Sequence, residues 1–331
     1  MLNYNVKANK AKQSSKLISK IKFQELGVLC VLLVICAILA VITPNFRETA
    51  NLINVVRQFS EISIMAIGMT FVIICAEIDL SVGSIYGLCA IMAAYMLNKG
   101  MNPLVAFLSA LLTGMAIGFI NGFLATKGKI PAFIVTLATL ALARGSAFAI
   151  SKGWPISEFP DTNNWFFGMG ARIGGVIPVQ IIIMLLLNVI AAIFLGKTTF
   201  GYKVYAVGGN KNAARLAGIA VDRVKIISFV IMGALSALAG MIGLAHLNSV
   251  AATAGTGREM DVIAAVIIGG TNLYGGKGTI LGTLIGAAIM GVVRNGMVLL
   301  GVQAYYQEAF IGLVILIAVL ADTWLTKSRS R

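Results

Sequence analysis

Apolar stretches follow one another along the whole chain, separated by short breaks that are charged or rich in glycine and proline. A membrane-spanning helix needs about 20 mostly apolar residues, since lipid offers its backbone groups no partners. We therefore expect an all-α polytopic membrane protein of about ten transmembrane helices, some of them short or broken. The expected spans are 26–42, 60–77, 83–97, 104–125, 132–150, 178–196, 226–247, 262–271, 279–300 and 306–322.

The composition excludes a water-soluble globule. Hydrophobic residues make up 59% of the 331 residues and charged residues only 11%, whereas charged residues make up about 25% of a soluble domain. Too few polar side chains are present to cover a surface that faces water. The chain must therefore expose much of its surface to membrane lipid.

The net charge of +14 comes from 26 Lys and Arg residues against 12 Asp and Glu residues. Such a surplus is typical of cytoplasmic loops of membrane proteins, so nucleic acid is not an expected partner. Six basic residues precede the first span and six lie between residues 197 and 225. This bias predicts that both termini are cytoplasmic. The predicted organisation is a basic tail (1–25), a transmembrane domain (26–322) and a second basic tail (323–331).

Two of the connections between spans are long. The segment 151–178, predicted to lie outside, contains Pro, Gly and aromatic residues that suit a structured cap on the membrane surface. The inner segment 197–225 contains a helix signal over 211–217, with Asn210 as N-cap and Gly218 as terminator. So short a helix is marginal in water. It is either a peg that docks on a partner or part of a plain charged loop.

No motif of an enzyme or cofactor site is complete in the sequence. The stretch Gly275–Thr279 resembles a phosphate-binding loop, but Thr271 stands where a Walker A motif needs its first Gly and Gly278 where it needs Ser or Thr. The single His and the four Cys residues show no metal-ligand spacing. We expect neither catalysis nor a bound cofactor in this chain.

Polar residues within the apolar spans are candidates for a substrate pathway, because a polar group in lipid is costly unless it faces a cavity or a partner. Asp79 lies where Ser81 and Gly83 suggest a helix break, and it is either a buried helix cap or a pathway residue. The other candidates could equally hold helices together by hydrogen bonds. The full set is Glu77, Asp79, Asn121, Thr136, Arg144, Arg294 and Asn295.

The string Ile78-Asp79-Leu80-Ser81-Val82-Gly83-Ser84 resembles the signature of bacterial ABC importer permeases of the ribose/galactose type. The resemblance covers about Pro44 to Asp322. Glu77 stands where this family commonly has Gly. Further similar stretches are Asn121–Gly122 through Pro131–Ile134 with Arg144–Gly145, Gly201–Val221, Thr253–Gly257, Ala264–Gly286, Leu300–Val302 and Tyr305–Gln307.

The resemblance implies a permease in the bacterial cytoplasmic membrane that carries a monosaccharide. Ribose is the first expectation, with other pentoses, galactose-like hexoses and a sugar-like signal molecule as alternatives. The implied partners are a cytoplasmic ATPase, an extracytoplasmic sugar-binding protein and a second permease subunit, most simply another copy of this chain. The helix at 211–217 then becomes the coupling helix. The implied coupling residues are Gly208, Gly209, Asn210, Ala213, Ala214, Arg215 and Gly218.

A rival interpretation is a secondary transporter that moves a small polar solute together with protons through Glu77 and Asp79. It predicts uptake that a proton gradient drives without an ATPase. A membrane-embedded enzyme would be a third class, but no catalytic group of residues supports it.

Overall fold

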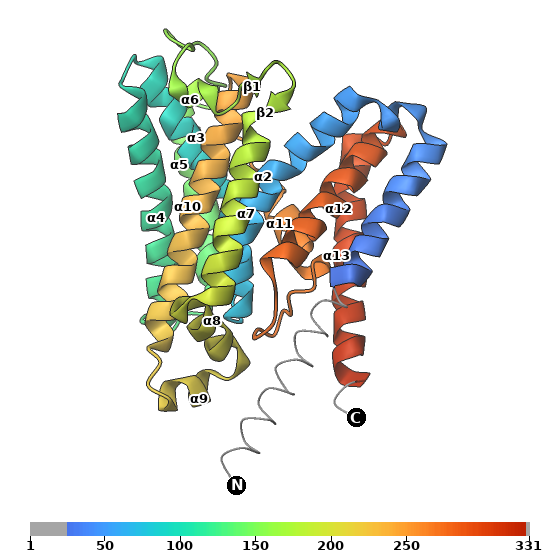
Figure 1. Cartoon of the computed structure of the whole chain (residues 1–331). Helices are drawn as coiled ribbons and strands as arrows, with labels where there is room; N and C mark the ends of the chain where they lie inside the picture. The colour runs from blue at the N-terminus through green and yellow to red at the C-terminus, as the bar shows by residue number, and fades with distance from the viewer. Residues whose placement is uncertain (1–24, 329–331) are drawn as a thin grey trace.

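Most residues of the computed structural model, which describes residues 25–328, are in helices (Figure 1). The parts of the two predicted tails at 1–24 and 329–331 lie outside the described residues. The first described helix is Glu25–Ile42. It is followed by η1 (Pro44–Arg47), α2 (Thr49–Ile74), α3 (Val82–Asn98), α4 (Pro103–Thr126), α5 (Ala132–Ser151), α6 (Trp165–Gly168), β1 (Arg172–Ile173), β2 (Ile177–Pro178), α7 (Val179–Lys197), α8 (Thr199–Gly209), α9 (Lys211–Leu216), α10 (Val221–Leu247), α11 (Arg258–Ile268), α12 (Ile280–Leu299) and α13 (Ala304–Ser328).

Seven helices among the described residues are long and apolar enough to cross a membrane. They are Glu25–Ile42, α2, α4, α5, α7, α10 and α12. Two of the remaining predicted stretches fall on the shorter apolar helices, Val82–Asn98 and Tyr305–Ile317 within α13, and the last falls on the 11-residue α11. The all-α polytopic architecture is therefore present, while the count of ten spans stays a prediction.

Helix α2 lies at the centre of the molecule (Figure 1). It packs against α10 and α7 on one side and against α11 and α12 on the other. Within an apolar stretch of 18 residues, 78% of the residues of α2 are buried, whereas only 22% are buried in the corresponding stretches of α4 and α5. The exposed apolar side chains of α4, α5 and the N-terminal helix form the surface that is expected to contact lipid.

The bounds of α2 differ from the predicted span 60–77. The helix begins at Thr49. The prediction placed its start later because polar residues such as Arg57 interrupt the apolar run. It ends at Ile74, where Ala76 adopts a positive φ of 59°. The backbone then closes a Schellman turn, with Ala76 N–H bonded to Ile73 O and Glu77 N–H to Val72 O. Glu77 and Asp79 therefore lie outside any helix.

Helices α4 and α10 approach each other closely through glycine. A methyl group built on Gly114 would overlap with the Gly233 carbonyl oxygen, and one on Gly233 would overlap with that of Gly114. Small residues at such crossings let two backbones pack against each other in a membrane. This contact fixes α4 beside α10 along much of their length (Figure 1).

The segment predicted as an outer cap contains α6 and a short antiparallel pair, with Arg172 opposite Pro178 and Ile173 opposite Ile177. Phe166 and Phe167 of α6 are buried. A further bridge joins Ile156 to Val250, after the end of α10. The segment therefore packs on the end of the bundle opposite to α8 and α9 (Figure 1).

Candidate functional site

The break between α2 and α3 brings two of the predicted pathway residues together. Asp79 is fully buried, and its Oδ1 accepts hydrogen bonds from the backbone N–H (2.8 Å) and the hydroxyl of Ser81. Asn121 of α4 donates from Nδ2 to the Ser81 hydroxyl at 2.9 Å. Thr139 of α5 donates to Asn121 Oδ1 at 2.6 Å. This chain of four side chains, the Asp79 chain, ties the break to α4 and α5.

One oxygen of the Asp79 chain has no partner among the described residues. Asp79 Oδ2 is buried without a hydrogen bond, and such a group is costly in a low-dielectric interior. Oδ1 stabilises the turn before α3, as expected of a buried cap, and the pathway role of Asp79 stays a prediction.

Glu77 is paired rather than free. Its carboxylate accepts a hydrogen bond from the Lys225 ammonium group of α10, and both side chains are mostly buried. This ion pair gives Glu77, which stands where the resembled family commonly has Gly, a structural partner on α10.

Arg144 of α5 holds the non-helical segment 248–257 that joins α10 to α11. Its Nη1 donates to the carbonyl oxygens of Ala252 (3.1 Å) and Ala254 (2.6 Å). Gly255 packs against Gly83 at the start of α3, where a methyl group on either glycine would overlap with the other's carbonyl oxygen. The segment is therefore clamped between α5 and α3.

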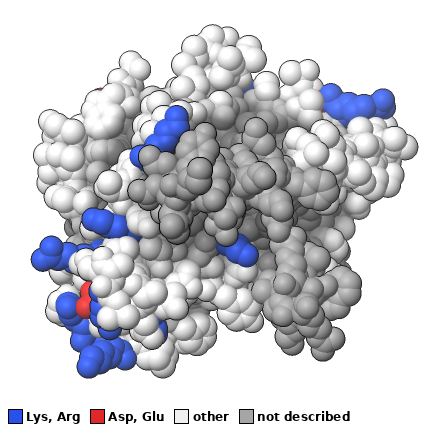
Figure 2. Space-filling view, turned by 60° about the horizontal axis from the view of Figure 1, so that its bottom comes forward, with Lys and Arg blue, Asp and Glu red and all other residues white. Residues whose placement is uncertain are grey.

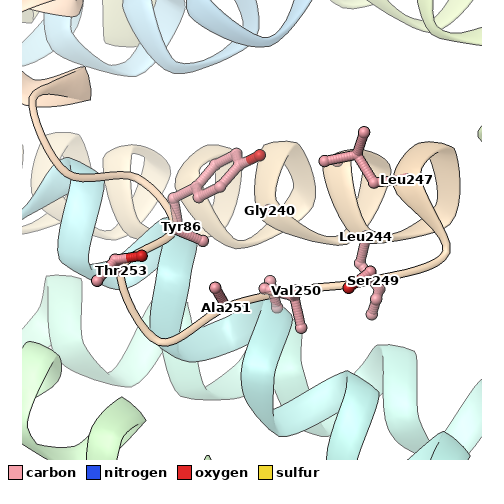
Figure 3. Close-up of a pocket in the computed structure, with 11 residues that line it drawn as sticks. Tyr86, Gly240, Leu244, Leu247, Ser249, Val250, Ala251 and Thr253 are labelled. Atoms are coloured by element: carbon pink, nitrogen blue, oxygen red, sulfur yellow. The ribbon is translucent and has the colours of Figure 1, made fainter. Parts of the chain in front are cut away.

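A pocket of about 440 Å³ lies beside this segment, between α3 and the end of α10 (Figure 3). Its volume falls in the range of small-molecule sites, which is about 300–1,000 Å³. The lining is mostly apolar, with the hydroxyl-bearing side chains of Tyr86, Ser249 and Thr253. Apolar walls with a few polar groups are common in small-molecule sites.

The remaining predicted pathway residues lie in separate places. Thr136 is buried and makes only a long hydrogen bond to Phe133 O of its own helix (3.4 Å). Arg294 of α12 donates through Nε and Nη2 to Asp261 Oδ1 of α11, at 3.1 and 2.9 Å. Asn295 exchanges two amide hydrogen bonds with Asn51 of α2, at 3.1 and 2.8 Å. The last two residues act here as links between helices.

Sequence reasoning missed a polar group next to the pocket. Glu61 of α2 pairs with Arg258 at 3.2 Å and accepts a hydrogen bond from the Tyr86 hydroxyl at 3.0 Å. The Arg258 guanidinium lies 6.0 Å from the centre of the Tyr86 ring. Glu61 could have been found as a carboxylate inside an apolar span, the same signal that identified Glu77.

The predicted coupling residues lie on two consecutive short helices, α8 and α9, and the turn that ends α9. Asn210 caps α9, because its Oδ1 accepts from the N–H groups of Asn212 and Ala213, both at 3.0 Å. Gly218 has a φ of 80°, and a Schellman turn ends the helix through Gly218 N–H to Arg215 O and Ile219 N–H to Ala214 O. The helix ends one residue before the predicted 217. These caps fix the shape of a six-residue helix that would be marginal alone.

The surface of α9 combines positive charge with an exposed apolar side chain. Leu216 is 91% exposed. Arg215 lies 3.6 Å from Asp222, which also binds Lys127, the residue after α4, at 2.8 Å. Figure 2 shows basic side chains gathered over this end of the molecule, with acidic atoms among them. Both interpretations of this segment, a docking peg and a plain charged loop, therefore stay predictions.

Gly208 and Gly209, the last two residues of α8, have different surroundings. Gly208 lies against the backbone of Ile74 and Gly276, whereas no atom lies within 4 Å of a methyl group built on Gly209. Of the other predicted coupling residues, Ala214 is buried and Ala213 is exposed. The element therefore has an inner side that packs on the bundle and an outer side that is free.

Residues 51–319 match the protein family described as the permease component of the branched-chain amino acid transport system. Over 298 residues, the chain is 46% identical to the ribose import permease protein of Escherichia coli strain K12, covering 89% of this chain and 92% of that protein. The ribose import permease of Bacillus subtilis strain 168 is 46% identical over 301 residues, with 90% and 92% covered. The autoinducer 2 import permease of Photorhabdus luminescens is 36% identical over 300 residues, with 90% and 89% covered. No solved structure matches the chain.

Proposed function

Because the chain belongs to the family of ABC-importer permease components that it matches from residue 51 to 319, we propose that it forms the membrane pathway of a bacterial ribose importer. The observation that carries this proposal is the 46% identity to the ribose import permease of Escherichia coli over 89% of the chain. Its place is the bacterial inner membrane, and its apolar helices fit a multi-pass protein.

Permeases of this family are not enzymes, so the energy comes from elsewhere. The family implies a cytoplasmic ATPase and an extracytoplasmic binding protein as partners. We propose that both termini lie on the cytoplasmic side, together with α8 and α9. Two features support this orientation: α13 ends on the side of α8 and α9 (Figure 1), and Thr279 at the start of α12 donates a hydrogen bond to Glu25 at 2.7 Å.

The proposed contact with the ATPase is α9. The exposed Leu216 and the neighbouring Arg215 give it an apolar tip beside positive charge. Its two caps hold it rigid, so that it can transmit a push instead of unwinding. The matching partner surface is a groove with an apolar floor and acidic rim.

The proposed outer part of the pathway is the pocket beside Tyr86 (Figure 3). Glu61 fixes the Tyr86 hydroxyl, and the clamped segment 248–257 forms one wall. We propose a second copy of this chain as the other half of the transporter, with lipid around the outside.

The substrate is tested by uptake of labelled ribose into cells that lack their own ribose permease and carry this chain with the ATPase and binding protein of its own system. Ribose import predicts uptake that unlabelled ribose abolishes and that galactose and xylose leave nearly unchanged. Autoinducer 2 is the informative competitor, because one relative carries that name. Stronger competition by autoinducer 2 than by ribose would contradict the assignment of the substrate.

A further inference from the structure

Three segments that are distant in the sequence meet at one backbone oxygen, the carbonyl of Ile74 at the end of α2. Gly276 N–H, from the loop between α11 and α12, donates a hydrogen bond to this oxygen at 2.9 Å. Gly208 of α8 packs against the same oxygen, so a methyl group there would overlap with it and lie 2.6 Å from Gly276 N. The last carbonyls of a helix lack partners within it, and here another segment supplies one.

The loop 269–279 has a defined backbone shape that presents Gly276 to α2. Asn272 closes it, donating from N–H to Lys277 O and accepting from Gly275 N–H, both at 3.0 Å. Gly275 and Gly276 have φ values of 86° and 75°, which side-chain-bearing residues adopt only with strain. The hydrogen bonds of Asn272 therefore hold the loop in a conformation that presents Gly276 N–H to Ile74 O.

A hydrogen bond also ties α8 to the same loop. The Tyr205 hydroxyl donates to Gly278 O at 2.7 Å. Gly278 immediately precedes Thr279, whose side chain caps the start of α12. Helix α8 is thus attached to the loop at two points, three residues apart along its own sequence.

The contact at Ile74 O is connected to two membrane-embedded parts of the chain, the break before α3 and helix α12. Ile74 is followed within five residues by Asp79, so a shift at the end of α2 reaches the break before α3. The loop leads into α12 through Thr279. Backbone atoms in direct contact leave no flexible side chain to absorb a displacement. A push on α8 is therefore passed to α2 and α12 together.

We infer that Ile74, Gly208 and Gly276 form a transmission joint that passes movement of α8–α9 to the α2–α3 break and to α12. The inference rests on the proposed docking of the ATPase at α9. Gly208, Gly276 and Tyr205 are positioning residues, since they touch neither ATP nor the sugar in this account.

The test compares Gly208→Ala with Gly196→Ala in the assembled importer. The added methyl group displaces the joint at Gly208, whereas at Gly196, in the last turn of α7, it enters open space. The expected result for Gly208→Ala is a fall in ribose transported per ATP hydrolysed of about tenfold, within the range of coupling between sites. The amount of ATPase that co-purifies should stay unchanged, and Gly196→Ala should behave as the parent chain.

A second pair of variants serves if Gly208→Ala does not accumulate in the membrane. Each of these variants removes only one hydroxyl group. Tyr205→Phe loses the bond to Gly278 O, whereas Tyr202→Phe changes an exposed ring on the same helix. The joint predicts less ribose moved per ATP for Tyr205→Phe alone. Equal transport per ATP in Tyr205→Phe and Tyr202→Phe, or in the two Gly variants, would overturn the joint.

Failure of the joint differs from failure of the docking proposal. If Gly208→Ala loses ATPase association in proportion to transport, Gly208 acts in docking and the joint is wrong. If Leu216→Ala leaves ATPase association unchanged, α9 is not the docking element, whatever the Gly208 variant does.

Discussion

The Asn121 amide nitrogen lies 2.9 Å from the Ser81 hydroxyl oxygen, although the two residues are 40 positions apart. This bond fixes the non-helical segment after α2 to the side of α4. A break inside a membrane protein exposes backbone groups that need partners, and polar side chains of neighbouring helices supply them. The break between α2 and α3 is therefore an ordered, hydrogen-bonded part of the bundle rather than a frayed helix end.

The first prediction concerns the Asp79 chain and uses two threonines of α5. Thr139→Val removes the donor to Asn121 Oδ1 and leaves that buried oxygen unpaired, which costs about 1–3 kcal/mol. Thr136→Val removes only a 3.4 Å bond to its own helix. Thermal unfolding in detergent should show a lower midpoint for Thr139→Val than for Thr136→Val. Equal midpoints would mean that the chain contributes no stability.

The second prediction concerns the ion pair between Glu77 and Lys225. Each single charge reversal, Glu77→Lys or Lys225→Glu, places two like charges together in a mostly buried site and should lower the amount of folded permease in the membrane. The double reversal restores opposite charges and should recover much of the loss. A double-mutant cycle measured by thermal unfolding gives the coupling energy, expected at about 1–3 kcal/mol.

The same pair separates the two transport classes. Glu77→Gln keeps the shape of the side chain and cannot carry a proton. Ribose uptake per folded molecule should stay dependent on ATP and lose less than half of its rate, as an approximate bound for a structural residue. Complete loss of uptake with normal folding would instead favour proton transfer through Glu77.

The third prediction concerns the clamp on the segment 248–257. Arg144→Ala removes the donors to Ala252 O and Ala254 O, so the segment should open more often. The probe is Ala252→Cys, a buried position, in a chain whose four native cysteines are replaced by alanine. A membrane-impermeant thiol reagent should label this cysteine about tenfold faster in the Arg144→Ala variant than in the chain that keeps Arg144. The reason is the loss of two hydrogen bonds from a charged group.

The matched control for the clamp is Ser146→Ala, two residues along α5. Its hydroxyl bonds only to Leu142 O of its own helix and is exposed to the surroundings. This variant should leave the labelling of Ala252→Cys unchanged. If Arg144→Ala behaves in the same way, the segment is held by its packing alone.

The fourth prediction concerns the tip of α9. Leu216 is 91% exposed, so Leu216→Ala should change the unfolding midpoint little, as expected for surface positions. Loss of an apolar anchor from an interface costs about 2 kcal/mol or more, so the amount of co-purified ATPase should fall at least several-fold. Arg215→Glu should weaken the same association. Leu300→Ala, another exposed leucine, is the control that should retain the ATPase.

The sequence predicted the helices well because lipid leaves few alternatives to an apolar helix. Each predicted apolar stretch falls on a helix. The two ends of α9, at Asn210 and Gly218, were predicted from the residue types that commonly cap helices. The ends of α2 were not predicted, since polar residues are tolerated in its first turns and Ala76, a residue that rarely adopts positive φ, ends it.

The grouping of polar residues could be predicted only in part. Asp79 and Asn121 were identified as candidates, but their link runs through Ser81, whose role depends on how three helices pack. Arg144 and Arg294 were identified by charge alone, and their partners are backbone carbonyls and a distant aspartate. Gly208 was predicted as a coupling residue, but its contact with the Ile74 carbonyl and with Gly276 depends on how distant segments pack.

The central claim is that this chain moves ribose only as part of an ATP-driven assembly. The most direct measurement is ribose uptake into proteoliposomes that contain the purified permease, with or without its ATPase, binding protein and ATP. The account predicts uptake only when all components and ATP are present, and no response to a proton gradient. Ribose uptake driven by a proton gradient with the permease alone would contradict it.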